Sequence, residues 1–217
     1  MITTLLNSYK FIIAFLWHFF DVEHDEKSRF NEYARCDIFC GKTGQGKTLC
    51  AVREMKIMKK QFKNLKIISN IASPLVDIEL TRSSLLATYN FPVLVVIDEA
   101  NTTFSGSRVS SIPPDVKSFI FQTRKGYGKR LILLTQDYSL IDVSFRKLSH
   151  YVYNVKTFWG RLTALARFEQ VQYERNADTG GIDYGKKNLS YARIFFIQTN
   201  RLRRLYDFKS FVNTNWI

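Results

Sequence analysis

The sequence predicts an α/β fold in which a mainly parallel central sheet is flanked by helices, and three observations support this prediction. Residues 92–97 and 130–135 are mostly apolar runs, which are typical of strands buried on both faces of a parallel sheet. Segments of strand length alternate along the chain with segments of helical character. A glycine-rich segment, 41–48, joins a short apolar run at 36–40 to residues 49–62, which contain no Gly or Pro and are expected to be helical.

The glycine-rich segment matches the G-x-x-x-x-G-K-[ST] pattern of a phosphate-binding P-loop, and it consists of Gly41, Lys42, Thr43, Gly44, Gln45, Gly46, Lys47 and Thr48. Its glycines let the backbone bend so that successive N–H groups point at phosphate oxygens. Lys47 is expected to reach the β- and γ-phosphates, and the Thr48 hydroxyl to ligate Mg²⁺. The N-terminus of the following helix would face the same phosphates. The sequence therefore predicts a P-loop NTPase of the RecA-like (ASCE) type, with ATP and Mg²⁺ as its cofactors.

The rest of the core, which we place at residues 35–160, continues the alternation. Residues 65–71 carry three isoleucines and predict a second strand, which Pro74 and the polar stretch at 81–84 interrupt. Further elements are expected in this order: a short helix at 85–89, the strand at 92–97, a loop at 101–114, a helix at 115–124, the strand at 130–135, a helix at 137–150 and a strand at 151–158.

The N-terminal segment, residues 1–34, differs from the core. Residues 11–20 are apolar except for His18 and predict a hydrophobic helix that is too short to cross a membrane. We expect this helix to pack on its own domain or a neighbouring subunit, or alternatively to contact a capsid or a membrane surface. The charged residues 21–35 predict a linker.

The C-terminal segment, residues 161–217, is expected to be a β-rich extension of the same domain. Residues 166–174 and 191–198 have the character of strands. Residues 176–188, which are rich in Gly, Asp and Asn, predict the long hairpin loop between them.

Polar residues at the ends of two predicted strands complete the candidate site. Asp98 and Glu99 follow the apolar run at 92–97, and an Asp at this position can hold the shell of a Mg²⁺ ion. Glu99 is placed to orient or deprotonate an attacking water molecule. Gln136 ends the next strand, where its side chain could sense the γ-phosphate. Acidic pairs also end strands without any catalytic role, but together with an intact P-loop they predict ATP hydrolysis.

Composition adds a candidate partner and a redox compartment. The formal net charge of +13 over 217 residues favours a polyanionic partner, and we expect DNA, contacted through its backbone. Candidate contacts are the loop at 102–111, which contains Arg108, and the basic cluster at 201–204. The three cysteines, which we expect to be free thiols in a reducing cytosol, are Cys36, Cys40 and Cys50.

Beyond the P-loop, the chain resembles the zonula-occludens-toxin-like ATPases of filamentous phages, which belong to the FtsK–HerA superfamily of DNA-pumping motors. The resemblance covers roughly residues 36–158, and its most specific part is an Arg-Lys-Gly segment followed by Thr-Gln. The segments that carry it are residues 95–100, 112–116, 123–142 and 145–148.

This resemblance implies a homohexameric ring around DNA, with ATP sites at subunit interfaces. It also implies an arginine finger supplied by a neighbouring subunit, at the position of Arg124, with Arg146 as a second candidate. An arginine there would stabilise charge on the γ-phosphoryl group, an effect of about 10³-fold or more in rate. The alternative for either residue is a DNA or surface contact.

From these observations we expect an ATP-driven DNA translocase that packages a viral genome into its capsid. The expected location is the host cytoplasm or a virion vertex, with membrane association as an option. The assembly ATPases of filamentous phages usually carry a membrane span after the motor domain, and nothing after residue 197 is apolar enough to be one. Two alternatives stay open: a membrane-associated extrusion or conjugation-type motor, and a nucleotide-binding structural protein with little turnover.

Overall fold

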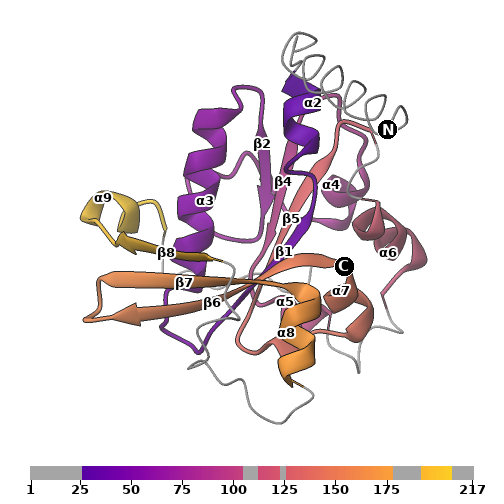
Figure 1. Cartoon of the computed structure of the whole chain (residues 1–217). Coiled ribbons are helices and arrows are strands. Elements are labelled where there is room, and N and C mark those ends of the chain that lie inside the picture. The colour runs from indigo at the N-terminus through magenta and orange to yellow at the C-terminus, as the bar shows by residue number, and fades with distance from the viewer. Residues whose placement is uncertain (1–25, 105–111, 123–125, 178–191, 207–217) are drawn as a thin grey trace, which may run out of the picture.

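The structure, a computed structural model of the chain, describes residues 26–104, 112–122, 126–177 and 192–206. It contains an eight-stranded sheet with helices on both faces (Figure 1). In chain order the elements are α2 (Glu26–Asn31), β1 (Cys36–Cys40), α3 (Lys47–Gln61), β2 (Lys66–Ser69), β3 (Ile78–Glu79), α4 (Arg82–Leu86), β4 (Val93–Ile97), α5 (Ala100–Thr103), α6 (Pro114–Phe121), β5 (Lys129–Thr135), the 3₁₀ turn η2 (Tyr138–Leu140), α7 (Val143–Leu148), β6 (Ser149–Phe158), β7 (Leu162–Glu169), α8 (Gln170–Ala177), β8 (Ala192–Ile197) and α9 (Asn200–Arg203).

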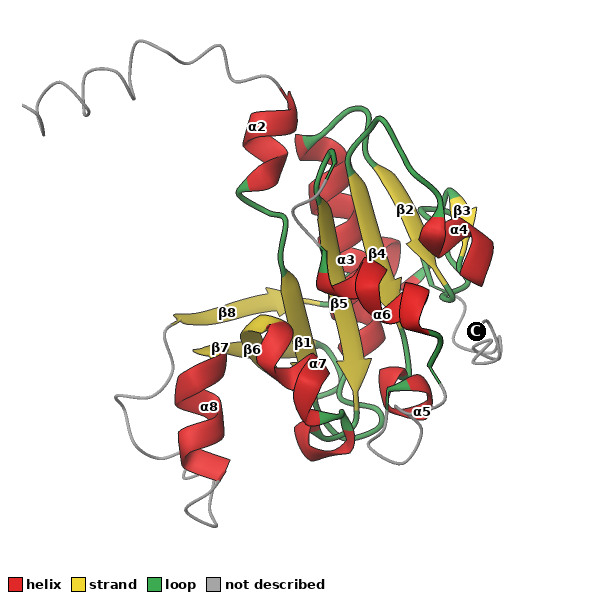
Figure 2. Cartoon of the chain, turned by 90° about the vertical axis from the view of Figure 1, so that its right-hand side faces the viewer, coloured by secondary structure: helices red, strands yellow, loops and turns green. Residues whose placement is uncertain are grey.

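The strand order is β3-β2-β4-β5-β1-β6-β7-β8. Neighbouring strands from β3 through to β6 are parallel, whereas the pairs β6–β7 and β7–β8 are antiparallel. Figure 2 shows the antiparallel strands running across the direction of β4 and β5. The predicted α/β fold, with a mainly parallel sheet and an antiparallel C-terminal part, is confirmed.

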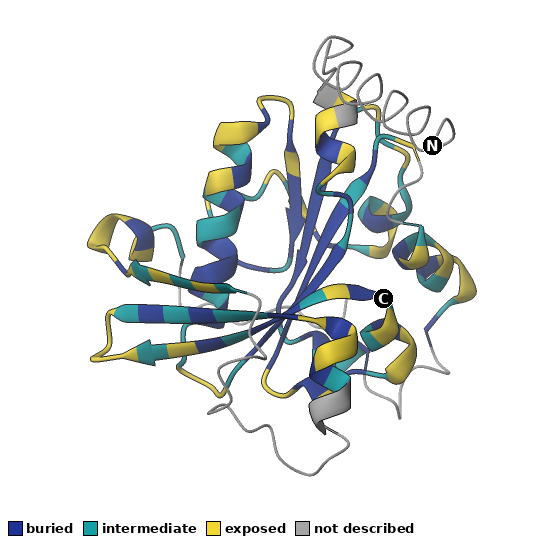
Figure 3. Ribbon diagram, in the orientation of Figure 1, coloured by how far each residue is buried: buried dark blue, intermediate teal, exposed yellow. Residues whose placement is uncertain are grey.

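The central parallel strands β1, β4 and β5 are buried on both faces, as their apolar runs predict. In β4, Val93, Val95 and Ile97 face one hydrophobic cluster, and Leu94 and Val96 face the other. Helix α3 covers the second cluster, while α5, α6 and α7 contribute to the first. Figure 3 shows the central strands buried and the outward faces of the helices exposed. The carboxyl ends of β1 and β4 are thereby held at one rigid edge of the sheet.

One helix begins earlier than the sequence predicts, and another replaces part of a predicted strand. The short helix expected at 85–89 is present as α4, and it starts within the polar stretch at 81–84, because Thr81 and Ser84 form a capping box that satisfies the first backbone N–H groups. Residues 170–177 form helix α8 in place of the second half of a predicted strand. Tyr173 of this helix packs against Phe168 and Tyr138, so tertiary contacts decide its conformation.

The boundaries of other elements differ in smaller ways. The predicted helix at 137–150 is a 3₁₀ turn followed by α7, and β6 already begins at Ser149. The expected linker at 21–35 contains helix α2, whose Phe30 is fully buried against Phe62 with ring centroids 5.2 Å apart. The hydrophobic helix expected at 11–20 and the hairpin loop at 176–188 beyond α8 lie outside the described residues. Of the loop expected at 101–114, residues 101–103 belong to α5, Pro114 begins α6, and residues 105–111 lie outside the described residues.

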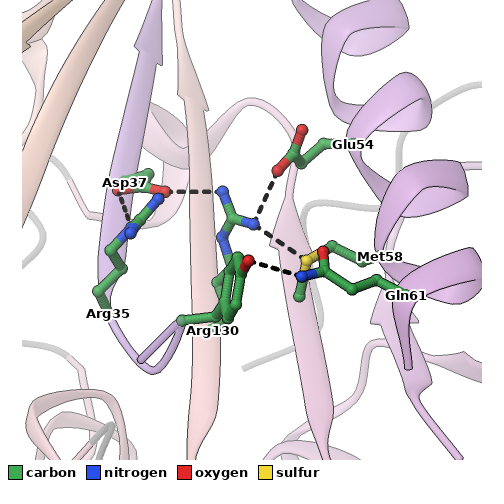
Figure 4. Close-up of polar contacts among 7 residues, drawn as sticks. Arg35, Asp37, Glu54, Met58, Gln61 and Arg130 are labelled. Atoms are coloured by element: carbon green, nitrogen blue, oxygen red, sulfur yellow. Dashed lines mark hydrogen bonds and ion pairs between the residues drawn. The ribbon is translucent and has the colours of Figure 1, made fainter. Parts of the chain in front are cut away.

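A buried ion network links the amino ends of β1 and β5 to helix α3 (Figure 4). The guanidinium of Arg130 donates to Asp37 over 3.0 Å and to Glu54 of α3 over 2.7 Å. The Nε of Arg35 donates to both oxygens of the same Asp37 carboxylate, each over 3.2 Å. Asp37 is 0 % exposed and Arg130 3 % exposed. Each charge in this interior therefore depends on its partner.

Two further expectations bear on the described residues. The three cysteines are free thiols, and all are buried, as predicted. Within the ranges that the structure covers, no helix has the length and apolar character needed to cross a bilayer.

Candidate nucleotide-binding site

The phosphate loop connects β1 to α3, and its backbone conformation depends on glycine. Gly44 and Gly46 have φ angles of 80° and 83°, in the left-handed region that glycine adopts without steric cost. A Cβ on Gly41 would lie 2.6 Å from the carbonyl oxygen of Val155 in β6. The loop is thus packed closely against the neighbouring strand, and geometry requires all three of its glycines.

Lys47 and Thr48 are the first two residues of helix α3. Lys47 is buried, at 7 % exposure, and its Nζ donates to the carbonyl oxygen of Lys42 over 3.5 Å. The Thr48 hydroxyl donates to the Asp98 carboxylate over 2.8 Å. The structure therefore brings the end of the P-loop and the acid that follows β4 into direct contact.

Asp98 is 4 % exposed, and burial raises the pKa of its carboxyl group, while the hydrogen bond from Thr48 opposes that rise. Asn70, which directly follows β2, holds the Asp98 backbone from the other side. The Asn70 side-chain amide donates to the Asp98 carbonyl over 3.0 Å and accepts from the Asp98 N–H over 2.8 Å. Sequence reasoning missed Asn70, because only the pairing of β2 with β4 places it beside Asp98.

Glu99 adopts a left-handed backbone conformation, with φ 51° and ψ 42°, and it caps helix α5. Among the described non-glycine residues, only Glu99 and Trp159 have a positive φ. Such conformations cost free energy in residues with a Cβ, and they cluster at active sites and ligand-binding segments. The Glu99 carbonyl accepts from both the N–H and the hydroxyl of Thr102, at 2.9 and 2.8 Å, and these bonds hold the turn.

The remaining predicted site residues have different outcomes. Gln136 is exposed directly after β5, the strand that separates β1 from β4, so it lies at the same edge of the sheet as the P-loop and Asp98. Arg146 is in α7, with its guanidinium 5.2 Å from the ring centroid of Tyr138. No hydrogen bond or ion pair among the described residues joins Arg146 to the P-loop. Arg124 lies outside the described residues.

A second contact that the sequence does not reveal fixes the tip of the P-loop. The backbone N–H of Thr157 in β6 donates to the Gln45 side-chain oxygen over 2.8 Å, and the Thr157 hydroxyl donates to the Gln45 carbonyl over 2.7 Å. These residues are separated by 112 positions in the chain, so no local pattern could have signalled the contact.

The residues present fit a magnesium-bound nucleoside triphosphate. Left-handed glycines and the start of α3 form a cradle of backbone N–H groups, and Lys47 supplies the positive charge. Thr48 and Asp98 supply an adjacent hydroxyl and carboxylate, the oxygen donors that Mg²⁺ prefers. Bound there, Mg²⁺ would neutralise charge on the phosphates. Glu99 follows Asp98 at the exit of β4.

This fold and this site define a P-loop NTPase. The model of the Zonular occludens toxin (Zot) family matches residues 36–163, and the chain belongs to that family. The N-terminal domain of zonular occludens toxin from Neisseria meningitidis has a similar structure, with a TM-score of 0.52 and 18 % sequence identity over 81 % of this chain and 100 % of that domain.

The genome packaging NTPase B204 from Sulfolobus turreted icosahedral virus 2 is also similar. Its sulfate complex gives a TM-score of 0.45 and 15 % identity over 58 % of this chain and 76 % of that one. No curated protein matches the sequence. The match to the family model thus identifies a Zot-family P-loop ATPase.

Proposed function

We propose that this ATPase hydrolyses ATP to move DNA during virion morphogenesis, and that it packages the genome into the capsid as a homo-oligomeric ring. The contact between Thr48 and Asp98 carries the first part of this proposal, because it assembles a Mg²⁺-binding pair beside the P-loop lysine. Glu99 then acts as the group that orients the attacking water molecule. A bare phosphate-binding loop would need neither acid.

The charge of the chain supports DNA as the cargo. A net charge of +13 gives a field that attracts a polyanion without reading its sequence. Arg201 and Arg204 of the basic cluster are exposed around α9 and are free to contact phosphates, whereas Arg203 is held by Gln198. We therefore expect Arg201 and Arg204 to contribute to DNA affinity, with a binding constant that falls as salt is added.

The test measures ATP turnover and oligomer mass together, with single-stranded DNA, double-stranded DNA or no DNA. Lys47→Ala should abolish turnover, while Lys60→Ala, at an exposed position near the far end of α3, should retain it. Turnover that persists in Lys47→Ala would refute the assigned site. A monomer in all three conditions, with no stimulation by DNA, would refute the motor.

Two further measurements, of solubility and of ATP binding, separate the rival functions. The solubility of a membrane-associated extrusion or conjugation-type motor would depend on detergent, and deletion of residues 1–20 would remove that dependence. A structural nucleotide-binding protein would bind ATP tightly and show no turnover even with DNA present.

A further inference from the structure

The C-terminal strands and α9 pack against the start of helix α3, next to the P-loop. In Figure 1, β7 and β8 cross the lower end of α3. Leu202 of α9 is buried in the same hydrophobic cluster as Leu49 and Val52 of α3. The guanidinium of Arg53 lies 4.8 Å from the ring centroid of Phe196 in β8. This part of the chain therefore shares a core with the helix that begins at the nucleotide site.

A buried glutamine, Gln198, lies where the two parts meet. It follows β8 and is 4 % exposed. Its side-chain nitrogen donates to the hydroxyl of Thr163 over 2.8 Å and to the hydroxyl of Thr157 over 3.2 Å. Thr157 in turn donates its hydroxyl proton to the carbonyl of Gln45 in the P-loop. A continuous chain of hydrogen bonds thus runs from Gln198 to the loop.

Gln198 also touches the loop directly. A Cβ on Gly46 would lie 2.9 Å from the Gln198 side-chain nitrogen and 3.0 Å from the Thr157 hydroxyl oxygen. Gly46 caps α3 and immediately precedes Lys47, so the amide of Gln198 packs against the backbone that aims the lysine. A shift of this amide would therefore displace the backbone that positions Lys47.

The oxygen of the Gln198 side-chain amide is held by Arg203. This oxygen accepts from the Nε and Nη2 of Arg203 over 3.2 and 2.8 Å. Arg203 also donates to the carbonyl of Gly160 in the turn between β6 and β7. Because arginine has only donors, its contacts fix which end of the amide faces the threonines. The orientation of Gln198 is therefore determined by its surroundings.

We propose that Gln198 is a positioning residue for nucleotide binding, which acts through Thr157 and Gln45 to hold the P-loop in its phosphate-binding conformation. The C-terminal extension is then a working part of the ATP site. This inference rests on the proposed function only in so far as the P-loop binds ATP. It concerns affinity, and it holds whether or not hydrolysis drives DNA movement.

The principal test is the dissociation constant of a fluorescent ATP analogue with Mg²⁺, measured for Gln198→Leu. Leucine fills a similar volume without the hydrogen bonds, and we expect affinity to fall roughly three- to tenfold, the effect of one or two lost hydrogen bonds. The KM for ATP should rise by the same factor with little change in kcat, because Thr48, Asp98 and Glu99 remain in place. Gln170→Leu is the matched control, since Gln170 is also buried, at 8 % exposure, but belongs to α8.

A second pair of variants keeps the proposal testable if Gln198→Leu does not fold. Thr157→Val removes the hydroxyl and should weaken binding of the analogue, whereas Thr157→Ser keeps the hydroxyl and should restore it. The effects of Gln198→Leu and Thr157→Val should be less than additive, because both interrupt one path. Affinity within twofold of wild type in Gln198→Leu or Thr157→Val would overturn the proposal. Wild-type protein that binds the analogue without hydrolysing it would refute the proposed motor and leave this inference intact.

Discussion

The hydroxyl of Thr48 and the carboxylate of Asp98 are joined by a 2.8 Å hydrogen bond across fifty positions of sequence. The bond exists because β5 alone separates β1 from β4, so that the loop after one strand and the acid after the other meet at one edge of the sheet. Each residue is a plausible Mg²⁺ ligand by type, but only the shared edge makes them a pair.

Replacing Asp98 with Asn should remove the charge of this pair and keep its shape. We expect the apparent affinity for Mg²⁺ in the presence of ATP to fall about 10- to 100-fold, as for other groups that support a metal. Stability to urea should be unchanged or higher, because a buried carboxylate is replaced by a neutral amide. Asp115→Asn, on the exposed surface of α6, is the control and should leave Mg²⁺ dependence unaltered. Unchanged Mg²⁺ affinity in Asp98→Asn would remove Asp98 from the site.

The raised pKa of Asp98 predicts a pH dependence with a definite sign. Its folded-state pKa lies above the unfolded value, so ionising Asp98 opposes folding, and this residue's contribution to stability falls as pH rises between the two values. Binding of Mg²⁺ needs the ionised form of Asp98. As the pH is lowered, Mg²⁺–nucleotide affinity should therefore begin to weaken at a pH above about 4, the ordinary pKa of Asp. Titration calorimetry as a function of pH measures this. If the loss of Mg²⁺–nucleotide affinity at low pH were identical in wild type and Asp98→Asn, Asp98 would not be the group that titrates.

Asn70 should matter to catalysis because its side-chain amide holds the backbone of Asp98. Asn70→Ala removes both hydrogen bonds to the Asp98 backbone and should lower the free energy of unfolding by about 1–3 kcal/mol. Turnover per folded molecule should also fall, because the strained peptide at Glu99 loses its support. Asn70→Asp keeps one acceptor but adds a negative charge beside Asp98. The loss of Mg²⁺–nucleotide affinity on acidification should therefore occur at higher pH in this variant. Full turnover in Asn70→Ala would show that the hydrogen bonds between Asn70 and Asp98 stabilise the fold without contributing to catalysis.

The ion network around Arg130 predicts an asymmetry between single and double variants. Arg130→Met leaves Asp37 buried beside Arg35 alone, and should cost about 3–5 kcal/mol of stability. Combining it with Asp37→Leu removes both charges and should recover part of that loss. Urea unfolding curves give both values. A double variant as unstable as the sum of the single variants would mean that the two charges do not depend on each other.

The three thiols should be unreactive in the folded protein. Burial raises the pKa of Cys36 and of Cys40 well above the ordinary value, and that of Cys50 to about 12. At pH 8 the reactive thiolate is therefore scarce and inaccessible. A chromogenic disulfide reagent should label no cysteine in the native state and all three in denaturant. Rapid labelling without denaturant would show that the core around β1 opens readily.

The sequence was sufficient for the parts of the site that are local. The P-loop follows from eight consecutive residues, and β4 follows from an apolar run that ends at Asp98. Asn70, Thr157 and Gln198 were not foreseen, because each reaches the site through strand pairing and no spacing in the chain reveals it. Helix α8 was also missed, because the aromatic contacts of Tyr173 outweigh a strand-like composition.

The support that Thr157 and Gln198 give to the P-loop has a consequence for synthesis on the ribosome. The loop emerges early, but β1 cannot pair on either side until β5 and β6 have been made, and the glutamine that backs Gly46 comes later still. Contacts this distant in sequence form slowly and late. A nascent chain should therefore bind ATP with full affinity only when nearly all of the described fold is complete. Unfinished chains should then neither hydrolyse ATP nor compete with finished ones for it.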